Sequence, residues 1–167
     1  MNIFAETTKS DMIDEHLYIQ KTKENSTVKC TVDDFDIYCM DIQFSPIQEV
    51  KELPNNDWFD EHGDDEYIPE ALCVKAYTWD IKFACKGAFK TVNEKINAFV
   101  AYLTGADGSG AEMKMYSTYT QIGRQGIRFL KMDDSAELIR DKNGDILMFN
   151  VTFKVNDPVT NIVLTKS

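Results

Sequence analysis

The sequence predicts a mainly β fold of the α+β class, an antiparallel β-sandwich or open barrel flanked by a single amphipathic helix at about 91–103. Two long runs of residues alternate between apolar and polar side chains, which indicates strands with one buried face. One run between them repeats its apolar residues at helical spacing. With 167 residues, of which 43% are hydrophobic, the chain suits a single domain over 1–167.

The first long strand is predicted over 72–86. Its apolar face consists of Tyr77, Trp79, Ile81, Phe83 and Cys85. The intervening positions are Thr78, Asp80, Lys82, Ala84 and Lys86. A period of two with one apolar face predicts a strand that packs on a core and shows its other face to water.

The second long strand is predicted over 147–155. Its inward face is expected to carry Leu147, Phe149, Val151, Phe153 and Val155. It ends before Asn156-Asp157-Pro158, because proline has no N–H for a sheet hydrogen bond. Upstream, Asn143-Gly144 favours a type I′ hairpin turn, so a partner strand is predicted at about 136–140.

Five shorter strands complete the predicted sheet. The longest covers 35–44, with Tyr38, Met40, Ile42 and Phe44 on one side and Asp41 and Gln43 on the other. The remaining ranges are 17–21, 27–32, 112–116 and 126–132. The segment Gly123-Arg124-Gln125-Gly126, which leads into the last of these strands, is interpreted as a hairpin or bulge. It is not interpreted as a phosphate-binding loop, because a strand and no helix follows it. Seven or eight strands joined mainly by short turns favour a sandwich or open barrel.

The predicted helix has a half-buried stripe and signals at both ends. The stripe consists of Val92, Ile96, Phe99, Val100 and Leu103. Thr91 and Glu94 have the spacing of a capping box at the helix start. Gly105 supplies the usual left-handed stop, and the glycine-rich segment 105–110 is expected to link the helix to the next strand.

The segment 48–70 is a long acidic and aromatic loop or arm. From Glu49 to Glu70 it holds nine acidic residues and one lysine, a net charge of −8 out of −10 for the chain. Bulky apolar residues among acids are typical of protein–protein contacts, so we expect the arm to pack on a neighbouring subunit. The predicted interface residues are Trp58, Phe59, Asp60, Tyr67 and Ile68. The competing interpretations are a solvated loop and aromatic residues that fold back onto their own core.

A second class of function is a ligand-binding β-sandwich for carbohydrate or calcium. It would use Trp58, Asp60, Asp64 and Asp65. The arm does not have the spacing of an EF-hand loop, and a glycosidase would need two carboxyls across a cleft, which neighbouring acids do not establish. A hydrolase that uses acidic residues is the third class.

Reactive residues are sparse, and we expect no enzyme activity, no catalytic residue, no cofactor and no metal. The two histidines, His16 and His62, lie in acidic stretches that we expect to be solvated. The four cysteines contain no CxxC pair and are expected to be reduced and mostly structural, with Cys85 buried.

Composition also argues against other classes of partner. No cluster of Lys and Arg is present to displace the counterions of nucleic acid, so specific nucleic-acid binding is not expected. No apolar run approaches the roughly 20 residues that cross a bilayer, and the N-terminus lacks the features of an export signal. We expect a soluble protein that is made without export and does not bind membranes.

The order of elements resembles a family of bacteriophage structural proteins. Strands and an amphipathic helix are followed by a glycine-rich link, Lys114-Met115-Tyr116-Ser117-Thr118-Tyr119 and the late strand ending in Phe153-Lys154-Val155-Asn156-Asp157-Pro158. This arrangement, over about 72–164, resembles the ring-forming domain of distal tail proteins of long-tailed phages and is similar to related tail-tube folds. The N-terminal half has no counterpart in that pattern, and we do not expect the second, often carbohydrate-binding domain of many distal tail proteins.

The resemblance implies a ring-only phage or prophage tail protein. Its partners would be copies of itself, in a hexameric ring, and other tail proteins. It would be made in the host cytoplasm and located in the tail of the virion. An acidic or neutral protein suits a channel through which DNA must pass without being held.

Overall fold

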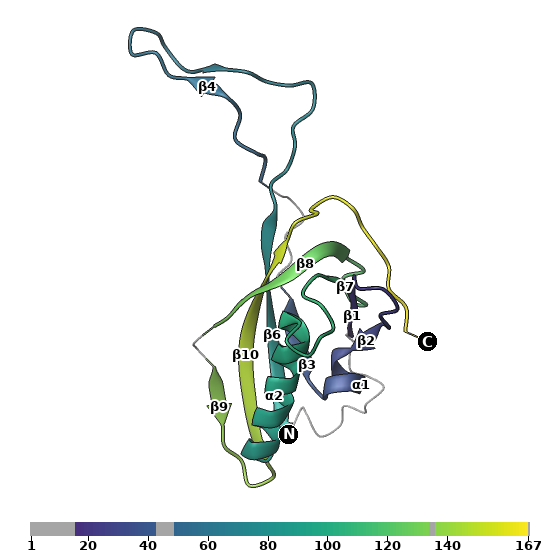
Figure 1. Cartoon of the computed structure of the whole chain (residues 1–167). Coiled ribbons are helices and arrows are strands. Elements are labelled where there is room, and N and C mark those ends of the chain that lie inside the picture. Colours follow the sequence, from purple (N-terminus) through teal and green to yellow (C-terminus); the bar gives the residue numbers. More distant parts are fainter. Residues whose placement is uncertain (1–15, 43–48, 134–135, 167) are drawn as a thin grey trace.

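The structure is a computed structural model that describes residues 16–42, 49–133 and 136–166 (Figure 1). The elements are β1 (Leu17–Lys21), β2 (Lys29–Cys30), α1 (Thr31–Phe35), β3 (Tyr38–Ile42), β4 (Asn55–Asn56), β5 (Asp65–Glu66), β6 (Tyr77–Gly87), α2 (Phe89–Thr104), β7 (Met113–Ser117), β8 (Gly123–Met132), β9 (Glu137–Ile139) and β10 (Asp145–Val155). The predicted class is confirmed: the protein is mainly β, with one long helix and an antiparallel eight-stranded sheet that is not closed.

The sheet is built around the two long strands. Its order is β2-β1-β7-β8-β10-β6-β3, and β9 also pairs with β10. β10 is aligned with β6 along its whole length, from Asp145 opposite Gly87 to Val155 opposite Tyr77. The other edge of β10 is shared, because β8 pairs with its C-terminal half and β9 with its N-terminal part.

The short helix α1 connects the two outer strands of this order. β2 and β3 lie at opposite ends of the sheet, yet only α1 and two residues separate them in the chain. The sheet must therefore bend so that its ends approach each other. Figure 1 shows β1, β2 and β7 to one side of α2 and the long strands β6 and β10 behind it. The result is an open barrel with α1 across the gap.

The core lies between α2 and the concave face of the sheet. The helix contributes Val92, Ile96, Phe99, Tyr102 and Leu103, all buried. The Phe99 ring centroid lies 5.2 Å from that of Phe83 on β6 and 5.2 Å from that of Phe35 on α1. Aromatic pairs at this separation add stability beyond the burial of their area. The strand and helix periodicities therefore converge on one aromatic cluster, as their apolar faces predict.

The helix is longer than predicted and begins differently. α2 begins at Phe89, where Ala88 is the N-cap and no side chain caps the helix. The capping box at Thr91 is therefore wrong: the Val92 N–H already donates to the Ala88 carbonyl, 2.9 Å away, so helical bonding starts one turn earlier. The predicted stop is confirmed, because Gly105 has φ of 80° in the left-handed region.

Three predicted strands are shorter than expected. The strand predicted over 72–86 begins at Tyr77, and those over 27–32 and 35–44 are interrupted by α1. The local reason is a turn that favours helix: the Asp34 carboxylate accepts the Cys30 N–H at 2.7 Å, and Asp36 ends the helix at φ of 55°. Residues 43 and 44 of the predicted strand lie outside the described residues.

An irregularity in β3 changes which side chains face the core. The register with β6 shifts between Cys39 and Asp41, which is a β-bulge at Met40. Tyr38, Met40 and Ile42 were expected on one side, but Met40 is exposed and Ile42 is buried. That expectation is wrong because the extra residue breaks the alternation.

Two glycine motifs have different outcomes. The bulge predicted at Gly123–Gly126 is confirmed: the β7–β8 register shifts there, and Gly126 has φ of 65°. The hairpin before β10 is also present, with β9 as its partner. Its turn is not type I′, because that type needs positive φ at both central residues and Asn143 does not have it. The Gly144 N–H donates to the Asp141 carbonyl instead.

A buried lysine secures the C-terminal end of α2. The Lys21 side chain is only 3% exposed, and its Nζ donates to the carbonyls of Gly110 (2.7 Å) and Leu103 (3.4 Å). The same ammonium lies 4.5 Å from the centre of the Tyr102 ring. A cation is favourable at the negative end of a helix dipole. Burial nevertheless lowers the pKa of Lys21 to about 8.

The C-terminal segment after β10 packs back along the sheet. The Ile162 N–H donates to the Gly123 carbonyl at 3.1 Å, and the Gly123 N–H donates to Asn161 Oδ1 at 2.9 Å. The approach is so close that a Cβ at Gly123 would lie 2.0 Å from the Ile162 carbonyl oxygen. Leu164 is buried at the end of this segment.

Candidate protein–protein interface

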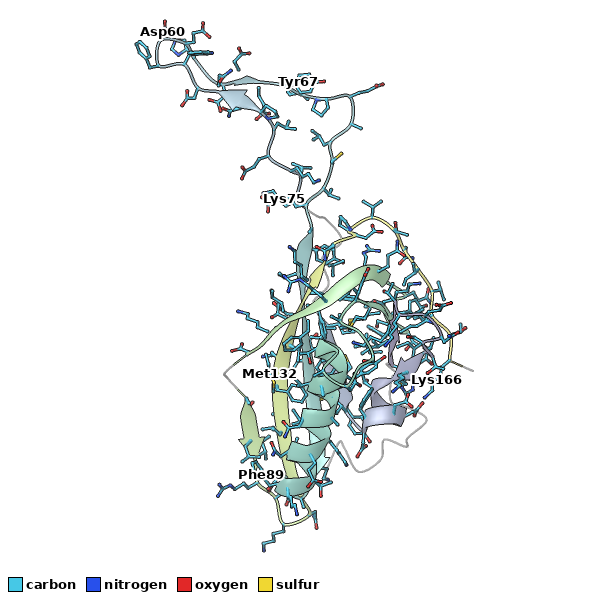
Figure 2. All side chains as sticks on the ribbon, in the orientation of Figure 1. Asp60, Tyr67, Lys75, Phe89, Met132 and Lys166 are labelled. Carbon is cyan, nitrogen blue, oxygen red and sulfur yellow. The ribbon has the colours of Figure 1, made fainter. Side chains whose placement is uncertain are left out.

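The acidic segment forms an arm that projects from one end of the sheet (Figures 1 and 2). At its base, Val50 and Val74 form an isolated antiparallel bridge. The Lys51 N–H donates to the Cys73 carbonyl, and the Lys75 N–H donates to the Glu49 carbonyl, both at 2.8 Å. The arm (residues 49–75) therefore leaves and re-enters the body at adjacent points.

Charge pairing reinforces the base of the arm. Lys75 Nζ lies 2.9 Å from a Glu49 carboxylate oxygen and 3.8 Å from one of Glu52. The hydrogen bond to Glu49 raises the pKa of Lys75 above its ordinary value. These exposed pairs orient the base but add little stability, because water and salt screen them.

The outer part of the arm has few internal bonds. β4 and β5 pair through only two residues each, Asn55 with Glu66 and Asn56 with Asp65. The Asn55 side-chain amide also donates to Asp64 at 3.1 Å. No side chain from Glu49 to Cys73 is buried. An isolated two-stranded ribbon of this kind is only marginally stable in water.

The predicted interface residues lie in two groups on the arm. Trp58, Phe59 and Asp60 form the tip, where the Glu61 N–H donates to the Trp58 carbonyl. Tyr67 lies between the tip and the base, beside Ile68 in the chain (Figure 2). Phe59 is 100% exposed and Trp58 51%. The alternative in which these rings fold back onto their own core is therefore wrong.

The candidate ligand site does not form a metal-binding cluster. Asp64 bonds to Asn55, while Asp60 lies at the exposed tip. Within residues 16–42, 49–133 and 136–166, no group of three or more His, Cys, Asp or Glu is placed to hold a metal ion. The acids of the arm are thus an extended charged surface.

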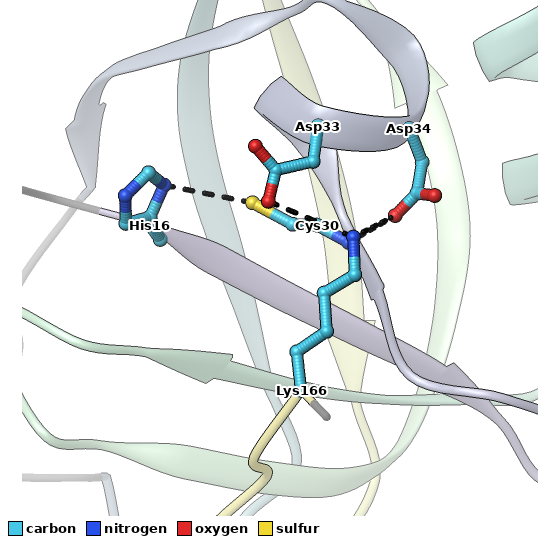
Figure 3. A network of polar contacts seen from close by, with 5 residues as sticks. All are labelled: His16, Cys30, Asp33, Asp34 and Lys166. Carbon is cyan, nitrogen blue, oxygen red and sulfur yellow. Dashed lines mark hydrogen bonds and ion pairs between the residues drawn. The ribbon is translucent and has the colours of Figure 1, made fainter.

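One polar network involves a histidine and a cysteine that the sequence did not connect (Figure 3). His16 Nδ1 lies 3.5 Å from Cys30 Sγ, so the expectation of a solvated His16 is wrong, although His62 is exposed as predicted. Cys30 is completely buried. Cys30 and Cys85 are buried free thiols, but Cys73 is exposed on the arm.

The same network holds the C-terminal segment against α1. Lys166 Nζ lies 2.8 Å from an Asp34 oxygen and 3.6 Å from one of Asp33 (Figure 3). Burial acts to raise the pKa of Asp34, but hydrogen bonds from Lys166 and the Cys30 backbone outweigh it and leave the pKa below its ordinary value. The spacing of these residues in the sequence gave no signal for this cluster, because Asp34 and Lys166 are far apart in the chain.

Comparison with known proteins adds no family. No protein-family model matches this chain, and no curated protein matches it. Among the described residues, no helix has the length and apolar character needed to span a membrane.

Proposed function

We propose that this protein is a structural component of a phage or prophage tail, at the distal tail or tube end, that assembles with copies of itself into a ring. The observation that carries the proposal is the arm, whose tip presents Trp58 and Phe59 to solvent with no core of their own. Burial of one such side chain is worth about 2 kcal/mol, so a partner surface would stabilise the arm. Self-assembly supplies that surface on every copy.

The shape of the arm favours action between molecules. It extends away from the body in Figures 1 and 2, with Asp60 at the far end and Lys75 at the junction. A role within one copy would require the arm to fold back onto the body. Aromatic anchors within a polar rim are the usual composition of the centre of a protein–protein interface.

The tail assignment rests on the resemblance in element order. The supporting features are the open antiparallel sheet, the helix across it and the glycine-rich link between α2 and β7. The net charge of −10 suits a channel that passes DNA without retaining it. The same proposal places the protein in the virion, as a hexameric ring in contact with other tail proteins, with no catalytic role.

Sedimentation velocity over micromolar concentrations tests the self-assembly. We expect ring-sized species for the wild type, alone or with a tail-tube protein, and monomers for the double variant Trp58→Ser/Phe59→Ser. Tyr119→Ser is the matched control, because Tyr119 is a similarly exposed aromatic residue on the body. A wild type that stays monomeric in both conditions would refute the proposal. Electron microscopy of the assemblies gives the ring symmetry.

A further inference from the structure

We infer that the outer face of the sheet, at the end remote from the arm, is the surface on a second copy that receives the arm tip. The inference rests on the proposed self-assembly and adds the receiving surface to it. The receiving surface is defined here as the outer side chains of β3, β6, β9 and β10 around Lys86 and Ile146.

The strand register identifies the side chains of this face. Residues directly opposite each other on paired strands lie on the same face of a sheet. Lys86 is opposite Ile146, which is opposite Ile139 on β9. One rung further, Ala84 lies between Tyr38 on β3 and Met148 on β10. These two rungs form an apolar area with a lysine at its edge.

A hollow of about 430 Å³ lies on this area. Its lining includes Tyr38, Met40, Ala84, Lys86 and Ile146. Met40 reaches it because of the bulge in β3, and it is 54% exposed, while Tyr38 is 49% exposed. The walls are mainly apolar side chains, so an aromatic ring placed there would displace water from apolar surface on both partners.

Two lysines on the receiving surface can pair with the acids of the arm. The outer rungs of β3, β6, β9 and β10 carry three basic side chains, Lys82, Lys86 and Lys154, and three acidic ones, Asp41, Asp80 and Glu137. Within the described residues, neither Lys82 nor Lys86 is ion-paired, and Asp36 at the edge of the hollow is paired with Lys95. These two unpaired lysines can meet carboxylates of an arm whose segment from Glu49 to Glu70 has a net charge of −8.

The arm of one copy lies away from its own hollow. It joins the body just before Tyr77, whereas the hollow lies at Ala84–Lys86, about 23 to 30 Å further along β6 at about 3.3 Å per residue. The arm also points the other way: Figure 2 shows Asp60 and Phe89, which follows β6, at opposite ends of the molecule. With the arm in this orientation, a contact between the arm tip and the hollow joins two copies.

The fit assigns a role to each part of the tip. Trp58 and Phe59 enter the hollow, and the carboxylates beside them, Asp57 and Asp60, meet Lys82 and Lys86. Donor and receiver are different patches of the same chain, so the contact is heterologous. Such a contact closes into a ring when the rotation between neighbours allows it.

Two variants separate the donor from the receiver. Trp58→Ser/Phe59→Ser damages the arm and leaves the hollow intact, whereas Met40→Glu/Lys86→Glu damages the hollow and leaves the arm intact. We expect each alone to weaken self-association by at least about ten-fold, as loss of a central anchor does. Mixed in equal amounts, they retain one intact contact per pair, so sedimentation velocity should show a one-to-one dimer and no ring.

A charge exchange tests the pairing in a chain that keeps its core. Lys86→Glu alone should weaken association, and Asp60→Lys in the same chain should restore it at least in part. Lys86 and Asp60 are both exposed, so the single changes leave folding intact, which circular dichroism and the thermal midpoint verify.

The outcomes distinguish the inference from the proposed function. If the wild type and both receiver variants assemble equally well, the receiving surface is wrong while self-assembly stands. The same conclusion follows if each damaged variant is monomeric but their mixture gives no dimer. If the wild type itself never associates, the proposed function fails and the receiving surface fails with it.

Discussion

Removal of the arm gives a sharp test of how the molecule is built. The perturbation replaces 52–72 by Asn-Gly and keeps the bridge between Val50 and Val74. The N–H of Lys51 donates to Cys73 across the base, so a two-residue turn can join the two strands there. The control is the protein with its arm, measured under the same conditions.

The expected result is no loss of stability. The removed segment contains no buried side chain, so no core contact is lost. Shortening a loop from about twenty residues to two lowers its closure entropy cost, which raises the free energy of unfolding by up to about 2 kcal/mol. The gain is an upper limit, because the base pairs of the arm already restrict the longer loop.

Urea denaturation, monitored by tryptophan fluorescence, measures the free energy of unfolding of both chains. The chain has two tryptophans, and removal of Trp58 leaves Trp79, which is 4% exposed in the core, as the single reporter. A fall in the free energy of unfolding by more than about 1 kcal/mol, or a clear fall in the denaturant slope, would show that the arm buries surface on its own core. Either result would refute the reasoning from exposure.

Three further predictions concern the body of the fold. Phe99→Ala should lower the free energy of unfolding by about 3 to 5 kcal/mol, because it opens a cavity against Phe83; a loss under about 1 kcal/mol in denaturant unfolding would contradict the aromatic core. The pKa of Lys21 in the folded protein is about 8, below its ordinary value of 10.5. Between pH 8 and pH 10.5 the unfolded chain therefore binds more protons than the folded protein, so the free energy of unfolding rises with pH in this range. The difference in unfolding free energy between wild type and Lys21→Met should therefore grow by about 1 kcal/mol from pH 7 to pH 9, and a constant difference would show that burial does not perturb this amine. Gly123→Ala should cost about 1 to 3 kcal/mol and expose the C-terminal segment to proteases, because the new Cβ overlaps the Ile162 carbonyl; unchanged protease resistance and stability would contradict that close approach.

The candidate site was predicted in its residues but not in its geometry. The mixture of acids with Trp58 and Phe59 indicated an arm, and the structure places both rings at an exposed tip. The proximity of His16 to Cys30 and the hollow beside Met40 had no signal in the sequence. Both depend on side chains from separate strands, which a reading along one chain segment does not bring together.

Local pattern determined the elements of this protein. The alternation in β6 and β10 and the stripe on α2 predicted which side chains are buried, because the period of a strand or helix acts over neighbouring residues. Tertiary structure decided the rest: β10 shares one edge between two strands, α1 spans the gap in the barrel, and a bulge turns Met40 outward. These features arise from pairing between distant segments, whose register is set by packing of the whole core and not by the residues of any one segment.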